Sequence, residues 1–522
     1  MKNKKIGFTL IELLAVIIVL AIIALIATPI IFNVIENAKI KSLENSCYGV
    51  IDAVRTKYAE GLLNLNKITN GNVNELTVSG EKPIDGTWTI DNSKDSEQRG
   101  IKIDNVRFSS MKDYACSNDL ETGKVSCKKT YKDNSSANTP ILFKNMVPIK
   151  YENNKWIIAD LGQKWYDYDA KEWANAVVLN SGVTKNVGDE VTEEEISLWY
   201  VWIPRYKYTI FNGNNGSAAA QLINVTFESG VSRTGTVTCT DNADGSETCS
   251  TITNGTGTYT HPAFKFGNTE LTGFWVGKFE ISTTDSTCNS SASSANCNKV
   301  LTMSIKPNVS SWKYATISNH FTSIQNARTT YGISNADSHM MKNMEWGAVA
   351  YLKQSKYGLG TTDIAVNTNS NFYTGGGQSD AYKTNVTQST TGNIYGVYDM
   401  SGGAWERVMG NMKNSSNTFY SSNAGFTTAP DAKYYDSYKY DTSNTSHVRG
   451  KLGDATKETL VTFGSFNGGW YSDYAHFPNS SYSWFIRGGY YVHGTNAGAF
   501  GFAHSDGGDD SHDSARAVLS AQ

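Results

Sequence analysis

The chain begins with an apolar segment that predicts a membrane-spanning helix. Residues 13–32 form a run of 20 residues without a charged side chain, enough for a helix to cross the ~30 Å hydrocarbon core of a bilayer. Lysines precede the run, which favours a cytoplasmic N-terminus. Apolar residues then continue at helical spacing, at Val34, Ile35, Ala38, Leu43, Val50, Ile51, Val54 and Tyr58. We therefore expect one long helix over 8–62.

The residues after this helix follow the short alternating pattern of β-strands. Apolar and polar residues alternate in 86–91, 100–110 and 124–131, with Gly, Asp, Asn and Ser between these segments. We expect a small β-rich head over 63–135.

A second alternating region surrounds three tryptophans, Trp156, Trp165 and Trp173. Tryptophans in such a pattern are more typical of packing than of a ligand site. We expect a β-rich connector over 136–198.

The remaining residues mix strand and helix patterns. Strands are predicted at 200–210, 273–282, 483–491 and 515–519, and helices at 340–358 and beyond Pro307. This mixture predicts an α+β domain over 199–522.

Composition narrows the class of protein. Only 18% of the residues are charged and 12% are aromatic, with 29 tyrosines and 46 glycines, a balance that suits an extracellular β-rich protein. The net charge of −3 gives no basic footprint for nucleic acid, and the sequence has no glycine-rich phosphate loop. We expect no nucleic-acid partner.

The seven cysteines predict local disulfides. Six of them form close couples: Cys116 with Cys127, Cys239 with Cys249, and Cys288 with Cys297. Each couple encloses polar turn residues, and closing such a loop stabilises the fold by on the order of 2–3 kcal/mol. A metal site is the alternative, but the sequence has no CxxC knuckle. Disulfides imply a compartment outside the cytoplasm, and Cys47 is left unpaired or intermolecular.

The N-terminal motif "KKIGFTLIELLAVIIVLAIIALIATP" resembles the type IV prepilin family. The resemblance implies that a prepilin peptidase cuts after Gly7 and that Phe8 is then methylated. It also implies that Glu12, a costly carboxylate in an apolar helix, pairs with the N-terminal amine of another pilin subunit during filament assembly. The precursor would sit in the inner or cytoplasmic membrane, and the mature protein in an extracellular filament or at the cell surface. A plain membrane anchor is the alternative.

Four phrases in 199–522, "FWVGKFE", "MEWGAVAYL", "YGVYDMSGGAWERV" and "FIRGG", resemble the C-type lectin fold of the formylglycine-generating-enzyme type. Enzymes of that family hold copper through two cysteines near the chain end, whereas no cysteine follows Cys297 here. We therefore expect no enzyme activity, cofactor or metal. The three late histidines, His493, His504 and His512, lack the spacing of a metal motif.

The stretch from Arg487 to Ser520 contains no Lys, Glu, Gln, Met, Trp or Cys. This palette resembles the variable proteins of diversity-generating retroelements, in which adenine-directed rewriting of asparagine codons yields Tyr, His, Asp, Ser and Gly but not the missing residue types. A Gly/Asp-rich surface loop is the alternative. The resemblance implies a variable region over 485–519 that binds an unknown protein or glycan.

Predicted ligand-binding residues are Tyr490, Tyr491, Val492, His493, Gly501, Ala503, His504, Ser505, Asp506, Asp509, Asp510, Ser511, His512 and Asp513. Arg487, Phe500, Phe502 and Arg516 are predicted to form the framework beneath them. Two other functions remain open, a surface-tethered oxidase-like enzyme and a purely structural pilin or adhesin.

Overall fold

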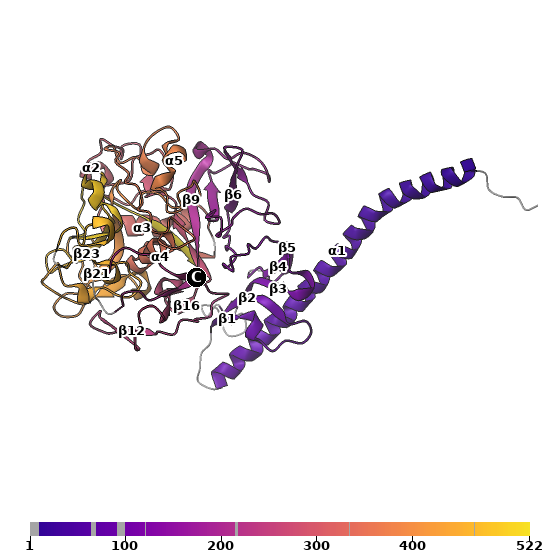
Figure 1. Cartoon of the computed structure of the whole chain (residues 1–522), viewed down its shortest axis with the longest axis horizontal. Coiled ribbons are helices and arrows are strands. Elements are labelled where there is room, and N and C mark those ends of the chain that lie inside the picture. The colour runs from indigo at the N-terminus through magenta and orange to yellow at the C-terminus, as the bar shows by residue number, and fades with distance from the viewer. Residues whose placement is uncertain are drawn as a thin grey trace, which may run out of the picture. The chain divides into compact units, whose positions relative to one another are not determined.

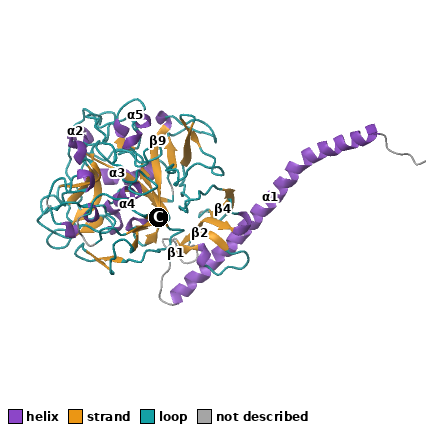
Figure 2. Ribbon diagram, viewed as in Figure 1, coloured by secondary structure: helices purple, strands orange, loops and turns teal. Residues whose placement is uncertain are grey.

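A computed structural model describes residues 10–63, 69–90, 100–120, 122–213, 218–333, 335–463 and 465–521. The chain divides into two compact units, residues 1–129 and 130–522 (Figure 1). Helices are few and strands are many, mostly antiparallel (Figure 2). The mixed class expected from the sequence is confirmed.

Unit 1 is built on the helix α1, Leu10–Leu63, which runs through Pro29 without interruption. Its second half buries Leu43, Val50 and Val54 against a five-stranded sheet in the order β1-β2-β3-β4-β5. The strands are β1 Asn70–Asn72, β2 Pro83–Ile90, β3 Ile101–Phe108, β4 Tyr114–Asn118 and β5 Val125–Lys129. The long helix and the small β-rich head agree with the predicted pattern, because the apolar stripe of the helix needs a partner surface.

The first half of α1 carries the predicted membrane span. Taken over its described residues, the structure contains no helix with both the length and the apolarity to cross a membrane. The structure does not describe the side chains of residues 10–13, 20–30 and 32, which include most of the predicted span.

The core of unit 2 is a seven-stranded antiparallel sheet in the order β20-β26-β17-β9-β8-β6-β7. Its strands are β6 Met146–Glu152, β7 Lys155–Ile158, β8 Asn175–Leu179, β9 Ile196–Pro204, β17 Gly273–Gly277, β20 Ala336–Met340 and β26 Ala517–Ala521. The predicted connector over 136–198 is therefore not a separate part. Its strands β6, β7 and β8 extend the same sheet, where β8 pairs with β9, with Ala176 opposite Tyr200 for example. Its three tryptophans are buried in the core of unit 2.

A second sheet carries the C-terminal stretch, with strand order β22-β21-β23-β24 and with β25 paired to β21. Its strands are β21 Trp405–Met412, β22 Asp436–Tyr438, β23 Trp484–Gly488, β24 Gly498–Ser505 and β25 Asp513–Ala515. β21 and β23 run antiparallel, whereas β25 runs parallel to β21.

Small strand pairs complete unit 2. They are β10 Tyr206–Thr209 with β11 Val225–Phe227 and β14 Thr258–Thr260, β12 Cys239–Asp241 with β13 Glu247–Cys249, β15 Lys265–Phe266 with β16 Thr269–Glu270, and β18 Ser282–Thr283 with β19 Met303–Ser304.

The helices of unit 2 are α2 Ser294–Cys297, α3 Ile317–Thr330, α4 Asn343–Lys353 and α5 Ala381–Thr384. The predicted helix after Pro307 begins only at Ile317, because the Thr316 side chain accepts a hydrogen bond from the Asn319 amide and caps the helix there. α4 lies within the predicted 340–358 and is buried along its whole length.

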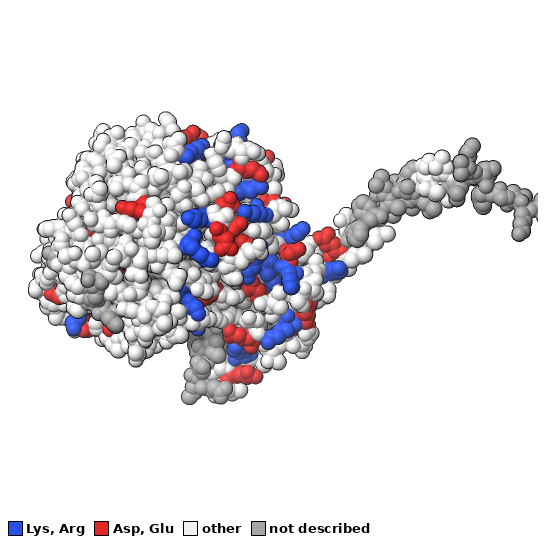
Figure 3. Space-filling view, viewed as in Figure 1, with Lys and Arg blue, Asp and Glu red and all other residues white. Residues whose placement is uncertain are grey.

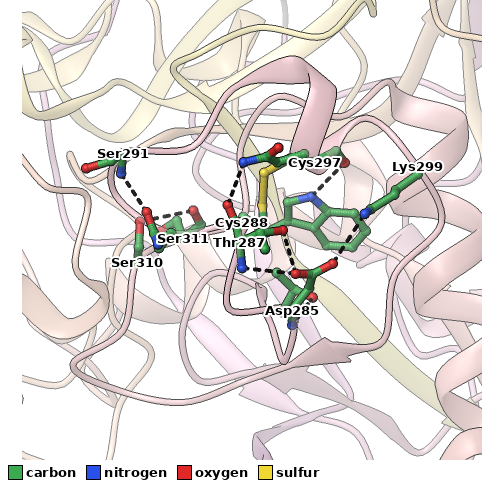
Figure 4. The surroundings of a disulfide bond; sticks show 12 residues. Asp285, Thr287, Cys288, Ser291, Cys297, Lys299, Ser310 and Ser311 are labelled. Carbon is green, nitrogen blue, oxygen red and sulfur yellow. Dashed lines mark hydrogen bonds and ion pairs between the residues drawn. A yellow bond between two sulfur atoms is a disulfide. The ribbon is translucent and has the colours of Figure 1, made fainter.

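All three predicted disulfides are present, Cys116–Cys127, Cys239–Cys249 and Cys288–Cys297. Figure 4 shows how the last one closes a polar loop: Asp285 accepts a hydrogen bond from Thr287 at 2.7 Å and pairs with Lys299 at 3.3 Å. The Trp312 indole donates to the Cys297 carbonyl at 3.2 Å, so the loop is fixed to the domain core.

Cys47 is the free cysteine among the described residues, and it is fully buried in α1. Its sulfur lies within 4.8 Å of both sulfurs of Cys116–Cys127. Burial raises the pKa of the Cys47 thiol to about 12, and Glu44 adds to this shift. Since the thiolate is the reactive form, the native thiol should be inert.

We predict that Cys47 resists a thiol-alkylating reagent in the native protein and reacts fully after denaturation. Ser42→Cys, at an exposed position on the same helix, is the matched control and should react at once. Mass spectrometry of alkylated peptides measures both. Native alkylation of Cys47 at the rate of the Ser42→Cys thiol would show that the helix does not pack as described.

Candidate binding face

The C-terminal stretch is anchored at one end by Arg516, which lies between β25 and β26. Its guanidinium donates to the carboxylate of Glu406 in β21, with 2.7 Å from Nε to Oε2, and pairs with the second carboxylate oxygen. It also donates to the carbonyl of Gly277 at 2.7 Å and of Tyr398 at 2.9 Å. All of Arg516 and Glu406 is buried, so this residue joins the two sheets where the chain crosses between them.

The other anchor is Arg487 in β23, which is also fully buried. It donates to the carbonyl of Ala455 at 3.0 Å and to Asn343 at 3.3 Å. Gly489 follows with φ +75°, and a Cβ there would lie 2.7 Å from Ala497. This left-handed turn, which favours glycine, lets the chain leave the strand and form the next turn.

Between the two arginines the backbone is tied down at several points. The carbonyl of Gly507 accepts from the Ile317 amide at 3.1 Å, that of Asp510 from Tyr314 at 2.8 Å, and that of His512 from Trp405 at 2.8 Å. These polar backbone groups are thus satisfied by other elements, and the course of the backbone is fixed.

The four residues predicted to form the framework, Arg487, Phe500, Phe502 and Arg516, are fully buried. Ten of the fourteen predicted ligand-binding residues keep at least partial exposure: Tyr490, Tyr491, Val492, His493, His504, Asp506, Asp509, Asp510, Ser511 and His512. Val492 is the most exposed apolar side chain of the stretch, at 53%.

The other four, Gly501, Ala503, Ser505 and Asp513, are buried and do not line an exposed face. Ala503 packs against Trp405 and Ile486, because β24 is covered on both sides. The Asp513 carboxylate pairs with the Arg407 guanidinium at 3.1 Å and accepts a hydrogen bond from Ser505 at 3.4 Å. These polar residues therefore belong to the interior.

Four of the exposed residues belong to what we call the aromatic layer, a group of rings over the second sheet. Its members are Phe372, Trp405, Tyr474, Tyr490, Tyr491, His493 and His512. Tyr490 is central, with ring centroids 4.3 Å from His493, 4.7 Å from His512 and 5.6 Å from Tyr491. Edge-to-face packing of this kind holds aromatic rings in defined orientations.

Sequence reasoning missed three members of this layer, Phe372, Trp405 and Tyr474, because they lie outside the predicted variable region. Phe372 has φ +57°, an uncommon conformation for a bulky residue that costs on the order of 1–3 kcal/mol and often marks a functional position. The density of aromatic residues between Phe463 and Phe485 is a signal that could have indicated Tyr474.

Two histidines of the stretch, His493 and His504, have pKa values that their surroundings lower. Burial lowers the pKa of His504 to about 4, and the neighbouring His476 lowers it further. Burial and then His512 lower the pKa of His493. Within the described residues, the groupings with metal-ligand geometry are Cys47 with Cys116 and Cys127, and Cys239 with Glu247 and Cys249. Each contains a disulfide, whose sulfurs are not thiolate ligands.

Three carboxylates on the face, Asp506, Asp509 and Asp510, accept hydrogen bonds from neighbouring residues. Asp506 accepts from the Asn423 side-chain amide at 2.8 Å, and Asp509 accepts from the Ser294 hydroxyl. Asp510 accepts from the His512 backbone amide at 2.8 Å and lies 3.0 Å from Nδ1 of the His512 imidazole. Among the described ion pairs, none joins these carboxylates to a lysine or arginine. The face is therefore aromatic and acidic.

The predicted processing residues Gly7 and Phe8 lie outside the described residues. The predicted assembly residue Glu12 lies on α1, and its side chain is outside the described part of the structure. A family model for the prokaryotic N-terminal methylation motif matches residues 2–28. No curated protein matches the chain.

The matched motif defines a prepilin-type N-terminus, which suggests processing by a prepilin peptidase, assembly with other pilins, and a membrane-anchored precursor of a surface pilus. Such a segment supports a pilin-like surface protein. The match ends before the second unit begins.

We predict that Asp513→Asn destabilises unit 2 by about 3–5 kcal/mol, because Arg407 would keep a buried charge without its carboxylate. Asp510→Asn, three residues earlier and exposed, is the matched control and should change the free energy of unfolding by less than about 0.5 kcal/mol. Denaturant titration of both variants measures the difference. Equal effects would contradict the division between interior and face.

Proposed function

We propose that this chain is a pilin-like surface protein that displays a ligand-binding domain at its C-terminal end. The domain is of the C-type-lectin-like, formylglycine-generating-enzyme type, is diversified by a retroelement, and is non-catalytic. Its ligand is a protein or glycan on another cell or phage. The N-terminal motif supports the export and anchoring half of this proposal.

The observation that carries the binding half is the division of the C-terminal stretch into two classes of side chain. Residues expected to stay constant, such as Arg487 and Arg516, are fully buried and bonded to several elements. Ten of the fourteen residues expected to vary, such as Tyr491, Val492 and Asp510, remain at least partly exposed on a backbone held by other segments. Exchange of the exposed side chains therefore costs little stability, as a variable binding surface requires.

The residue types on the face suit recognition. Tyrosine supplies contact area at low conformational-entropy cost, while Ser, Asp and His supply adaptable hydrogen bonds, as in antibody paratopes. The absence of any cysteine after Cys297 supports binding rather than copper-dependent oxidation, because a soft-metal thiolate site cannot form there.

Sequencing the DNA around the gene tests this proposal. We expect a near-copy of the codons for 485–519, differing mainly where it carries adenine, close to a reverse-transcriptase gene. A complete locus with neither feature would refute diversification and leave a pilin-anchored binding protein or a structural pilin.

A further inference from the structure

The aromatic layer and its carboxylates together point to a class of ligand. We infer that this face docks a partner protein that presents lysine or arginine side chains, with the cationic groups seated on the tyrosine and histidine rings beside Asp510. This inference rests on the proposed function and specifies the ligand that this particular sequence would bind.

The rings provide the first part of the argument. Tyr490, Tyr491 and His512 are half-exposed. Edge-to-face contacts hold the two tyrosines, with Phe372 at 5.0 Å from Tyr491, and the His512 ring packs against Tyr490 in a tilted contact. A cation over the face of an aromatic ring is attracted by the ring quadrupole, and arginine is the commonest partner.

The layer already receives one alkylammonium group from within the domain. The Nζ atom of Lys313 lies 3.7 Å from the centroid of the Phe372 ring, and the side chain is almost wholly buried. Burial lowers the pKa of Lys313 to about 8. This contact is an intramolecular example of the interaction that we assign to the outer rings.

The charges decide which partner fits. No lysine or arginine occurs between Arg487 and Arg516, and Arg407 is buried and paired with Asp513. Asp506, Asp509 and Asp510 therefore leave the face negative. In the view of Figure 3, charged side chains are also few over the part of unit 2 that carries β21 and β23 in Figure 1. A basic partner surface complements this face, whereas an acidic surface would be repelled.

Two short peptides test the inference with the full-length protein in detergent: one alternates Gly with Arg, and the other carries Glu in place of Arg. We expect the Arg peptide to bind at low ionic strength, to weaken as salt is added, and to bind at least roughly ten-fold more tightly than the Glu peptide. Intrinsic fluorescence titration measures both affinities.

Three variants identify the groups involved. Asp509→Asn with Asp510→Asn keeps the shape and removes the charge, and Tyr491→Leu keeps apolar area and removes the ring quadrupole. Each should weaken Arg-peptide binding by roughly three- to ten-fold. Asp169 has a half-exposed carboxylate and lies outside the face. The control variant Asp169→Asn should therefore leave binding unchanged.

Equal affinity for the two peptides, or unchanged affinity in the Asp509/Asp510 and Tyr491 variants, would overturn the inference. If the Arg peptide does not bind but the gene locus holds the template copy, this ligand class is refuted and the proposed function stays intact. If the Arg peptide binds and the variants weaken it as expected, but the locus lacks the copy, the ligand class is supported and diversification is refuted.

Discussion

The C-terminal unit depends on a buried arginine at the crossing between two sheets. Arg516 contacts β21 through Glu406, β17 through the Gly277 carbonyl, and the loop before β21 through the Tyr398 carbonyl. A buried guanidinium is costly unless its donors are satisfied, so this set of contacts specifies one register for both sheets. Burial raises the pKa of Glu406, and the bond to Arg516 opposes that rise.

The same constraint explains how an irregular stretch can be exposed and yet ordered. The chain between Arg487 and Arg516 is pinned at both ends, and hydrogen bonds from Ile317, Tyr314 and Trp405 hold its backbone in between. Most of the conformational entropy of the stretch is therefore lost on folding of the domain rather than on binding. A ligand meets rings and carboxylates whose positions are already set.

Much of this architecture could be predicted from local patterns. The helical periodicity around Val50 marked the packed half of α1, close spacing marked the disulfides, and alternation marked Phe500 and Phe502 as interior. Long-range pairing could not be predicted in this way. That Ala176 pairs with Tyr200 in the main sheet depends on strand order, which one strand's alternation does not encode.

The exposure of the site residues could not be predicted from local patterns either. Ser505 and Asp513 are polar residues of the kind that usually lie at a surface. The ion pair with Arg407, which lies far away in the sequence, nevertheless places Asp513 in the interior. Phe372 and Tyr474 join the aromatic layer only because segments that are far apart in the sequence meet there. Composition therefore indicated which stretch forms the face, and tertiary contacts decided which of its residues are exposed.

The most direct measurement of the central claim compares the face with the framework by denaturant unfolding. Combined replacement of Tyr491, Val492, Asp510 and His512 by serine should lower the free energy of unfolding of unit 2 by no more than about 2 kcal/mol. The single change Arg516→Met should lower it by about 3–5 kcal/mol, because Glu406 would lose its cation. If the fourfold replacement destabilised the unit as much as Arg516→Met, the exposed residues would be part of the fold and the account would be contradicted.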